Sequence, residues 1–165
     1  MSQQENLLLC LNFAQKMINE RDLPSAPRFI AADSVHHELG DVPPEYQGGP
    51  RAMAQFLNLY LRAFPDLRLT FEDALADRDR VATRWRLEGT QTGPLMGIAP
   101  SGRRVSIEGI RIDRIENGKI AESWMQMDTM GLLEQIGALP KLRREPLREM
   151  TPELARAPQK SRYVA

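Results

Sequence analysis

The spacing of apolar residues changes from helical to strand-like at Pro65, and this change limits the possible folds more than any other feature of the sequence. Upstream, apolar residues in segments 7–18 and 53–64 recur every three or four positions, as on one face of a helix. Downstream, apolar and polar residues alternate in segments 67–75 and 81–87, as in strands with one buried face. Helices followed by a meander of strands predict an α+β domain in which helices cover one face of an antiparallel sheet.

Local signals set the ends of the expected helices. Ser2 and Glu5 have the spacing of a capping box at the start of the first helix. Pro50 suits a first helical position, and Pro65 ends the same helix. Helices are therefore expected over 3–19, within 23–32, over 50–64 and just before Gly137, with an extended piece at 34–38.

The first two strands are expected to form a hairpin around Arg78. A two-residue loop would set apolar residues opposite charged ones, so we predict a three-residue loop over 77–79. The predicted pairs are Leu75 with Val81, Asp73 with Thr83, Phe71 with Trp85 and Leu69 with Leu87 on the apolar face, and Glu72 with Arg84 on the other.

The dipeptide Asn117-Gly118 is the strongest short hairpin signal in the sequence. A two-residue turn there pairs Glu116 with Lys119, and the register of the second hairpin follows by counting. The more apolar side is assigned to the interior. It pairs Ile112 with Ser123, Ile110 with Met125 and Glu108 with Met127, and leaves Arg111, Asp113, Glu122 and Gln126 on the outer face.

The composition excludes several classes of partner. Lys+Arg and Asp+Glu each count 22, so nothing in the total charge favours nucleic acid or an anionic membrane. The single cysteine, Cys10, cannot form an intrachain disulfide, and a cytoplasmic location is expected. The apolar run at 7–11 is too short to be a membrane span or a signal peptide.

The 165 residues are enough for one domain, which we place at 1–139. Residues 140–165 form a tail with seven basic and three acidic residues and a proline at every sixth position. This tail is predicted to be extended or disordered, or to lie on a neighbouring subunit.

The usual signatures of nucleotide, serine-hydrolase and zinc sites are absent from the sequence. His36 and His37 are adjacent and point in opposite directions if extended, so no histidine-rich metal site is expected. The chemistry must then use carboxylates, one histidine or the shape of a pocket.

Several short motifs, in order along residues 5–139, resemble the SnoaL-like polyketide (ester) cyclase family. They are 64–68 (FPDLR), 79–81 (DRV), 89–93 (GTQTG), 96–103 (MGIAPSGR) and 118–124 (GKIAESW). The resemblance implies the cone-shaped α+β barrel of the nuclear-transport-factor-2-like superfamily, with a curved antiparallel sheet around an apolar pocket. It also implies a homodimer or higher homo-oligomer, and a cofactor-free intramolecular aldol ring closure in polyketide biosynthesis.

The chain departs from the family at the acid/base position. The resemblance implies an aspartate directly after the motif tryptophan, whereas Trp124 is followed by Met125, whose thioether cannot carry a proton. By the predicted register Glu108 lies on the same face as Met125, and we expect it to be the base. His37, where family members often have a histidine or an acid, is expected to assist, and Asp73 is the second candidate base.

An adaptable apolar lining is expected to hold a small polycyclic or ester substrate. The leading hypothesis is a polyketide cyclase-type enzyme. The alternatives are a binding or scaffold protein without catalysis, and an isomerase, dehydratase or epoxide hydrolase on the same fold. The expected lining residues are Met53, Phe56, Tyr60, Trp85, Met96, Ile110, Ser123, Met125 and Met127.

Overall fold

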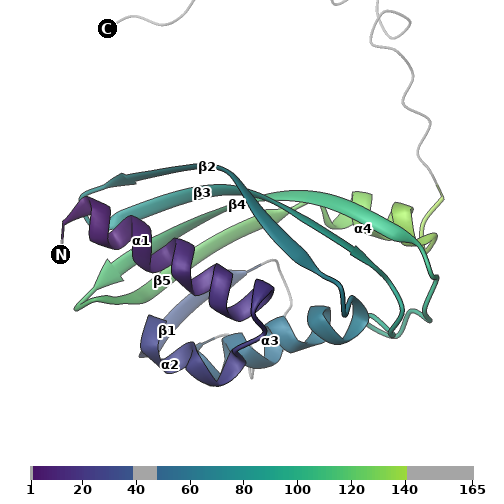
Figure 1. Ribbon diagram of the computed structural model, residues 1–165, viewed down its shortest axis with the longest axis horizontal. Helices are drawn as coiled ribbons and strands as arrows, with labels where there is room; N and C mark the ends of the chain where they lie inside the picture. The colour runs from purple at the N-terminus through teal and green to yellow at the C-terminus, as the bar shows by residue number, and fades with distance from the viewer. Residues whose placement is uncertain (1, 39–47, 141–165) are drawn as a thin grey trace, which may run out of the picture.

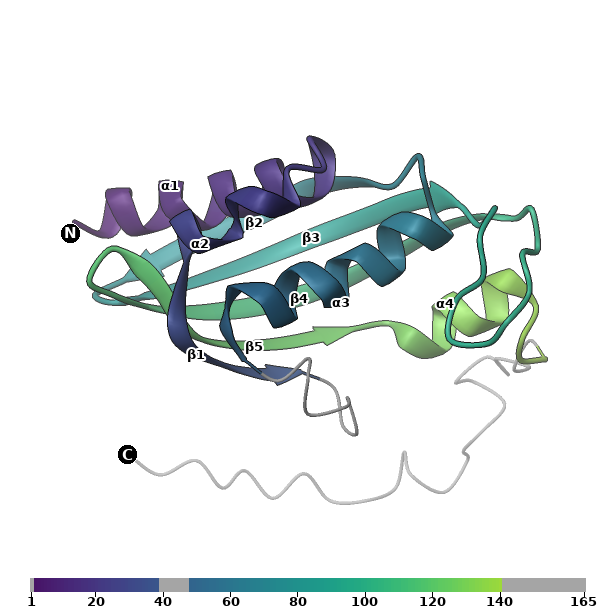
Figure 2. The ribbon, with the colours of Figure 1, turned by 90° about the horizontal axis from the view of Figure 1, so that it is seen from below.

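Five strands form one curved, open sheet in the order β1-β5-β4-β3-β2, and helices α1 and α3 cover its concave face (Figures 1 and 2). The computed structural model describes residues 2–38 and 48–140, and the predicted tail beyond Pro140 lies outside the described residues. The elements are α1 (Gln3–Ala14) with a π-helical turn (Gln15–Asn19), a 3₁₀ turn (Leu23–Ser25), α2 (Ala26–Phe29), β1 (Ile30–Glu38), α3 (Gly49–Ala63), β2 (Arg68–Asp77), β3 (Arg80–Thr90), β4 (Arg104–Glu116), β5 (Lys119–Met127) and α4 (Thr129–Ile136).

The α+β class and the cone-shaped architecture are confirmed, with one correction to the sheet. Strand β1 runs parallel to β5 at the edge, so the sheet is mixed rather than wholly antiparallel. The sequence signals for hairpins begin only after Pro65, and they left the extended piece at 34–38 without an assigned partner.

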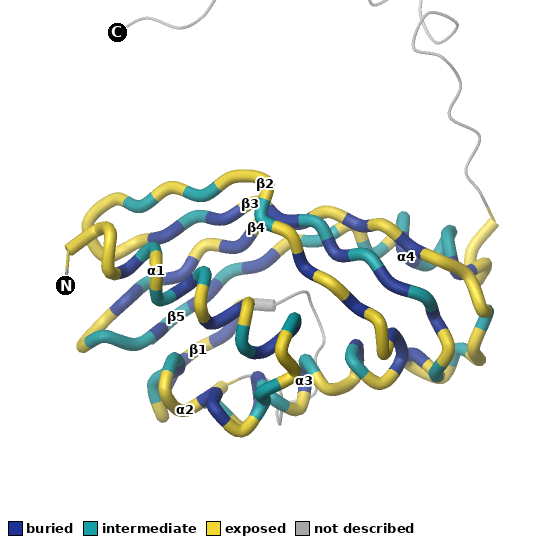
Figure 3. The backbone as a smooth tube through the Cα atoms, in the orientation of Figure 1, coloured by how far each residue is buried: buried dark blue, intermediate teal, exposed yellow. Residues whose placement is uncertain are grey.

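The capping box predicted at the start of the first helix is confirmed by its hydrogen bonds. Ser2 Oγ accepts from the Glu5 N–H at 3.2 Å, and the Glu5 carboxylate accepts from the Ser2 N–H at 2.7 Å. Helix α3 ends at Ala63, two residues before Pro65. Buried residues alternate with partly buried or exposed ones along β3 and β4, as expected for strands with one covered face (Figure 3).

The loop of the first hairpin differs from the prediction. Asp77 pairs with Arg80, so the turn has two residues, not three, and Leu75 lies opposite Ala82. A bulge at Glu72 then adds one residue to β2. It restores the predicted pairs of Phe71 with Trp85 and Leu69 with Leu87, because the two one-residue differences cancel.

The two-residue turn and the bulge also change the polar pairs of this hairpin. The turn places Asp73 opposite Arg84 rather than Thr83, and the bulge leaves Glu72 without a directly opposite residue. Glu72 forms an ion pair with Arg86 at 3.2 Å, instead of meeting Arg84.

The second hairpin has the predicted turn but a different register. Glu116 pairs with Lys119, and Ile115 pairs with Ile120, but Arg114 pairs with Glu122, so Ala121 is a bulge. That one extra residue on β5 reverses the predicted faces of β4. Arg111 and Asp113 lie on the concave face, opposite Met125 and Ser123, whereas Glu108, Ile110 and Ile112 lie on the outer face.

A buried histidine connects β1 to β5 and α3. His36 Nδ1 lies 2.6 Å from Ser123 Oγ on β5, and His36 Nε2 lies 3.1 Å from Ser34 Oγ. Ser34 Oγ in turn accepts from the Gly49 N–H at 3.1 Å. Burial, together with the nearby charge of Arg111, lowers the pKa of His36 to about 3. The ring is therefore neutral in the folded protein at ordinary pH.

We expect His36 to make the protein less stable as the pH falls. The unfolded chain takes up a proton on this ring near its ordinary pKa of 6.5, while the folded protein does so only near pH 3. The free energy of unfolding should drop by about 2 kcal/mol from this residue between about pH 7 and about pH 5. Urea unfolding across this range should show a shallower dependence for His36→Gln.

The matched control is His37→Gln, which removes the neighbouring histidine on the exposed face. It should leave most of the pH dependence in place. Equal slopes for His36→Gln and the unchanged protein would contradict the assignment.

Candidate functional site

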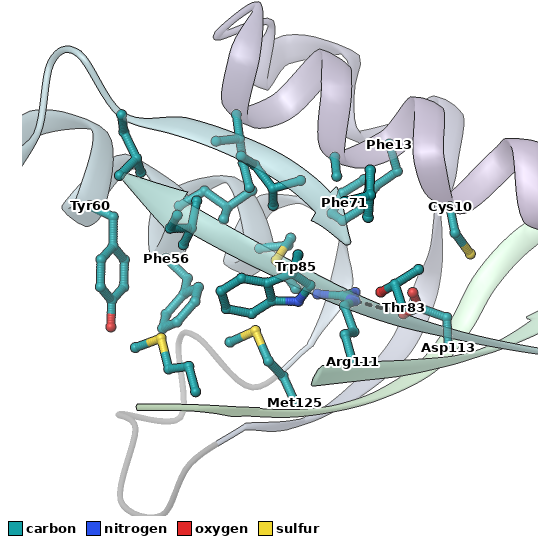
Figure 4. A pocket seen from close by; sticks show the side chains of 18 of the residues that line it. Cys10, Phe13, Phe56, Tyr60, Phe71, Thr83, Trp85, Arg111, Asp113 and Met125 are labelled. Atoms are coloured by element: carbon teal, nitrogen blue, oxygen red, sulfur yellow. Dashed lines mark hydrogen bonds and ion pairs between the residues drawn. The ribbon is translucent and has the colours of Figure 1, made fainter. Parts of the chain in front are cut away.

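A cavity of about 60 Å³ lies between α1, α3 and the concave face of the sheet (Figure 4). It is smaller than the roughly 300–1,000 Å³ of typical ligand pockets, so a polycyclic ligand requires lining side chains to move. Methionines are suited to such movement because they are unbranched. The lining residues are Cys10, Phe13, Ala14, Ile18, Met53, Phe56, Leu57, Tyr60, Leu61, Leu67, Leu69, Phe71, Thr83, Trp85, Leu87, Arg111, Asp113, Met125 and Met127.

Six of the nine predicted lining residues reach this cavity. Helix α3 contributes three of them, β3 one and β5 two, and they are Met53, Phe56, Tyr60, Trp85, Met125 and Met127. The other three lie elsewhere. Met96 is 65% exposed, Ile110 is 53% exposed on the outer face, and Ser123 is buried but hydrogen-bonded to His36.

A glycine on β4 makes room for the central aromatic ring of the cavity. A β carbon at Gly109 would lie 2.3 Å from the ring of Trp85 and 2.8 Å from the backbone oxygen of Gln126. The missing side chain at Gly109 therefore lets the indole lie flat against the sheet, where it forms one wall of the cavity.

The three predicted catalytic residues all lie on the outer face. The side chain of Glu108 is 56% exposed and forms an ion pair with Arg86 at 3.0 Å. Asp73 is exposed, opposite Arg84. His37 stacks on Trp124. The structure does not bring any of the three to the cavity. The two-residue turn after Asp77 sets Asp73 opposite Arg84, and the bulge at Ala121 puts Gly109 and Arg111, rather than Glu108, opposite the inward-facing methionines of β5.

His37 has its own partners on that face. Its Nε2 lies 2.8 Å from the Glu122 carboxylate, and this hydrogen bond, together with one from Arg114, lowers the pKa of Glu122. The guanidinium of Arg80 lies 5.2 Å from the Trp124 ring centroid. These contacts form an outer-face cluster that is separate from the cavity lining.

The charged group of the cavity is the ion pair of Arg111 and Asp113, which the predicted register had placed on the outer face of the sheet. Arg111 Nε donates to Asp113 Oδ1 at 2.8 Å, and the two side chains are almost fully buried. The guanidinium also lies 5.1 Å from the ring centroid of Phe13 on α1. An arginine and an aspartate two residues apart on one strand share a face, and this spacing was the available sequence signal for the pair.

Burial dominates the electrostatics of this pair. It raises the pKa of Asp113, while the Arg111 charge and a hydrogen bond from Cys10 oppose the shift. Burial and the charge of Asp113 also raise the pKa of the Cys10 thiol, which is therefore a neutral hydrogen-bond donor. A buried carboxyl with a raised pKa, next to a fixed positive charge, can exchange a proton with a ligand in the cavity.

Other types of site find no support in the described parts of the chain. Across residues 2–38 and 48–140, His, Cys, Asp and Glu side chains do not gather in groups of three that could hold a metal ion. Over the same stretches, none of the helices has the length and apolarity needed to cross a membrane.

Solved structures with the same fold come from several bacteria. AclR of Streptomyces galilaeus, a proposed hydroxylase, is 32% identical, with a TM-score of 0.74 over 87% of each chain. TsrD of Streptomyces laurentii is 29% identical, with a TM-score of 0.74 over 84% of this chain and 99% of its own. IdmH of Streptomyces antibioticus, a proposed polyketide cyclase, is 27% identical, with a TM-score of 0.65 over 77% of this chain and 95% of its own.

No curated protein sequence matches the chain. The sequence profile of the SnoaL-like polyketide cyclases matches residues 8–136, which include every element from the middle of α1 to the end of α4. The resemblance expected from the short motifs is thus confirmed over most of the chain. This protein belongs to the SnoaL-like polyketide cyclase family.

Proposed function

We propose that this protein catalyses a cofactor-free acid–base reaction, such as intramolecular aldol ring closure, on an apolar polyketide or ester substrate. The observation that carries the proposal is the buried Asp113 carboxyl beside Arg111 in an otherwise apolar cavity. Membership of the cyclase family and the likeness to IdmH support the reaction class. The homodimer and the cytoplasmic location stay predictions.

The proposed mechanism uses Asp113 as both base and acid. Its carboxylate removes a proton from the carbon next to a substrate carbonyl, and the charge of Arg111 stabilises the enolate oxygen that forms. The enolate carbon then attacks a second carbonyl of the same molecule and forms the new carbon–carbon bond. The protonated Asp113 returns its proton to the resulting alkoxide, which restores the carboxylate.

The test compares the carboxyl in the cavity with the one on the outer face. Asp113→Asn should lower kcat at least about 100-fold for ring closure of an aromatic polyketide methyl ester, because a neutral amide cannot exchange the proton. Glu108→Gln should leave kcat nearly unchanged. Ring closure is followed by chromatography and visible absorbance against an enzyme-free control.

Circular dichroism checks that each variant is folded. Loss of turnover in Glu108→Gln together with full activity in Asp113→Asn would overturn the assignment and return the role of base to Glu108.

A binding or scaffold protein without catalysis is the second candidate function. The observation that favours it is Met125, which lies on the concave face opposite Arg111, where the family resemblance implies the acid/base aspartate. In that case the cavity holds its ligand and the reaction occurs elsewhere. Isomerisation, dehydration or epoxide opening would instead be recognised from the products.

Substitution of Met125 separates these functions. Met125→Asp places a carboxylate next to Arg111 and should create or strengthen ring closure, at a cost in stability of a few kcal/mol because the group is buried. Met127→Asp is the matched control, since it changes the next inward-facing residue, opposite Gly109. A fall in stability without any gain in turnover would assign Met125 a packing role only.

A further inference from the structure

Thr83 has a buried polar side chain on the cavity wall, and this side chain makes no hydrogen bond that stabilises the described fold. It lies on β3, is 4% exposed, and lines the cavity. The other polar side chains buried on the concave face have partners, as in the pairs His36 with Ser123 and Arg111 with Asp113. Among the residues that the structure describes, the Thr83 hydroxyl makes no side-chain hydrogen bond.

The surroundings of Thr83 decide what its hydroxyl can bind. Thr83 lies opposite Arg111 on the neighbouring strand, next to the Arg111–Asp113 pair (Figure 4). Trp85, two residues further along β3, is buried on the same side and forms the apolar wall. A ligand ring that packs against Trp85 would therefore have one edge next to the Thr83 hydroxyl.

The positive charge of Arg111 favours an electron-rich oxygen at this position over an ammonium or amide nitrogen. A hydroxyl beside that charge can donate its proton to such an oxygen. A hydrocarbon that covered this hydroxyl would leave it unpaired and out of water, so a ligand oxygen that accepts from it gains affinity relative to a hydrocarbon of the same shape.

We propose that the Thr83 hydroxyl donates a hydrogen bond to the carbonyl oxygen of a cyclic ketone. The cavity then selects ring ligands that carry a ketone at the edge next to Thr83. This inference rests on the proposed function and names its substrate class. The hydrogen bond from Thr83 also orients the ligand, because it directs the carbon next to that carbonyl toward the end of the cavity that holds Asp113.

The test uses two probes with the same two-ring skeleton, 1-tetralone and tetralin, which differ by the ketone oxygen. Dissociation constants are measured by nuclear magnetic resonance from the indole N–H signal of Trp85. The ratio of the two constants is compared between the unchanged protein and Thr83→Val, which keeps the side-chain shape and removes the hydroxyl. Thr83→Ser keeps a hydroxyl, and Thr70→Val is a matched control on the exposed part of β2.

Thr83→Val should reduce the preference for 1-tetralone about tenfold and leave tetralin binding unchanged. Thr83→Ser and Thr70→Val should keep the preference. If Thr83→Val is not folded, Thr83→Ala gives the same comparison.

An unchanged preference in Thr83→Val would overturn the inference, because water or another group would then satisfy the hydroxyl. If both probes still bind the unchanged protein in that case, the result does not contradict the proposed function. If neither probe binds the unchanged protein, the cavity does not take ring ligands, and the proposed function falls together with this inference.

Discussion

The concave face is organised around the buried ion pair of Arg111 and Asp113. Taking either charge out of water alone would be strongly unfavourable, so the two must lie together, with Phe13 against the guanidinium and Cys10 donating to the carboxyl. A well-packed apolar pair of the same size would often be as stable or more stable. Stability alone therefore does not explain an ion pair in a cavity that is otherwise apolar, and the proposed acid–base role gives it a reason.

One residue outside the cavity decides which side chains of β5 share a face with this pair. Strand β3 holds Arg111 opposite Thr83 and Asp113 opposite Val81. Without the bulge at Ala121, β5 would pair with β4 one position further on, and Trp124 rather than Met125 would lie opposite Arg111. The bulge near the hairpin turn therefore brings the charged pair of β4 and the methionines of β5 to the same cavity.

The sequence predicted the helices, the Asn117-Gly118 turn and the inward face of β5, because each depends on local spacing or turn chemistry. It could not predict the inward face of β4, where isoleucines occur on both sides of the strand, so alternation does not choose between them. Bulges carry no comparable local signal. In the first hairpin a turn one residue shorter than predicted and the bulge at Glu72 cancelled, so the pairing of Phe71 with Trp85 was predicted correctly from an incorrect loop.

The same geometry changes the meaning of Met125. Its side chain lies opposite Arg111, so an acid at that position would be a direct neighbour of the guanidinium on the adjacent strand. Asp113 reaches the same guanidinium from two residues along β4. A methionine after Trp124 therefore does not leave the cavity without a carboxyl, since the carboxyl enters from the neighbouring strand. Whether this cavity holds a carboxyl depends on which groups surround Arg111, and the residue after the motif tryptophan alone does not decide it.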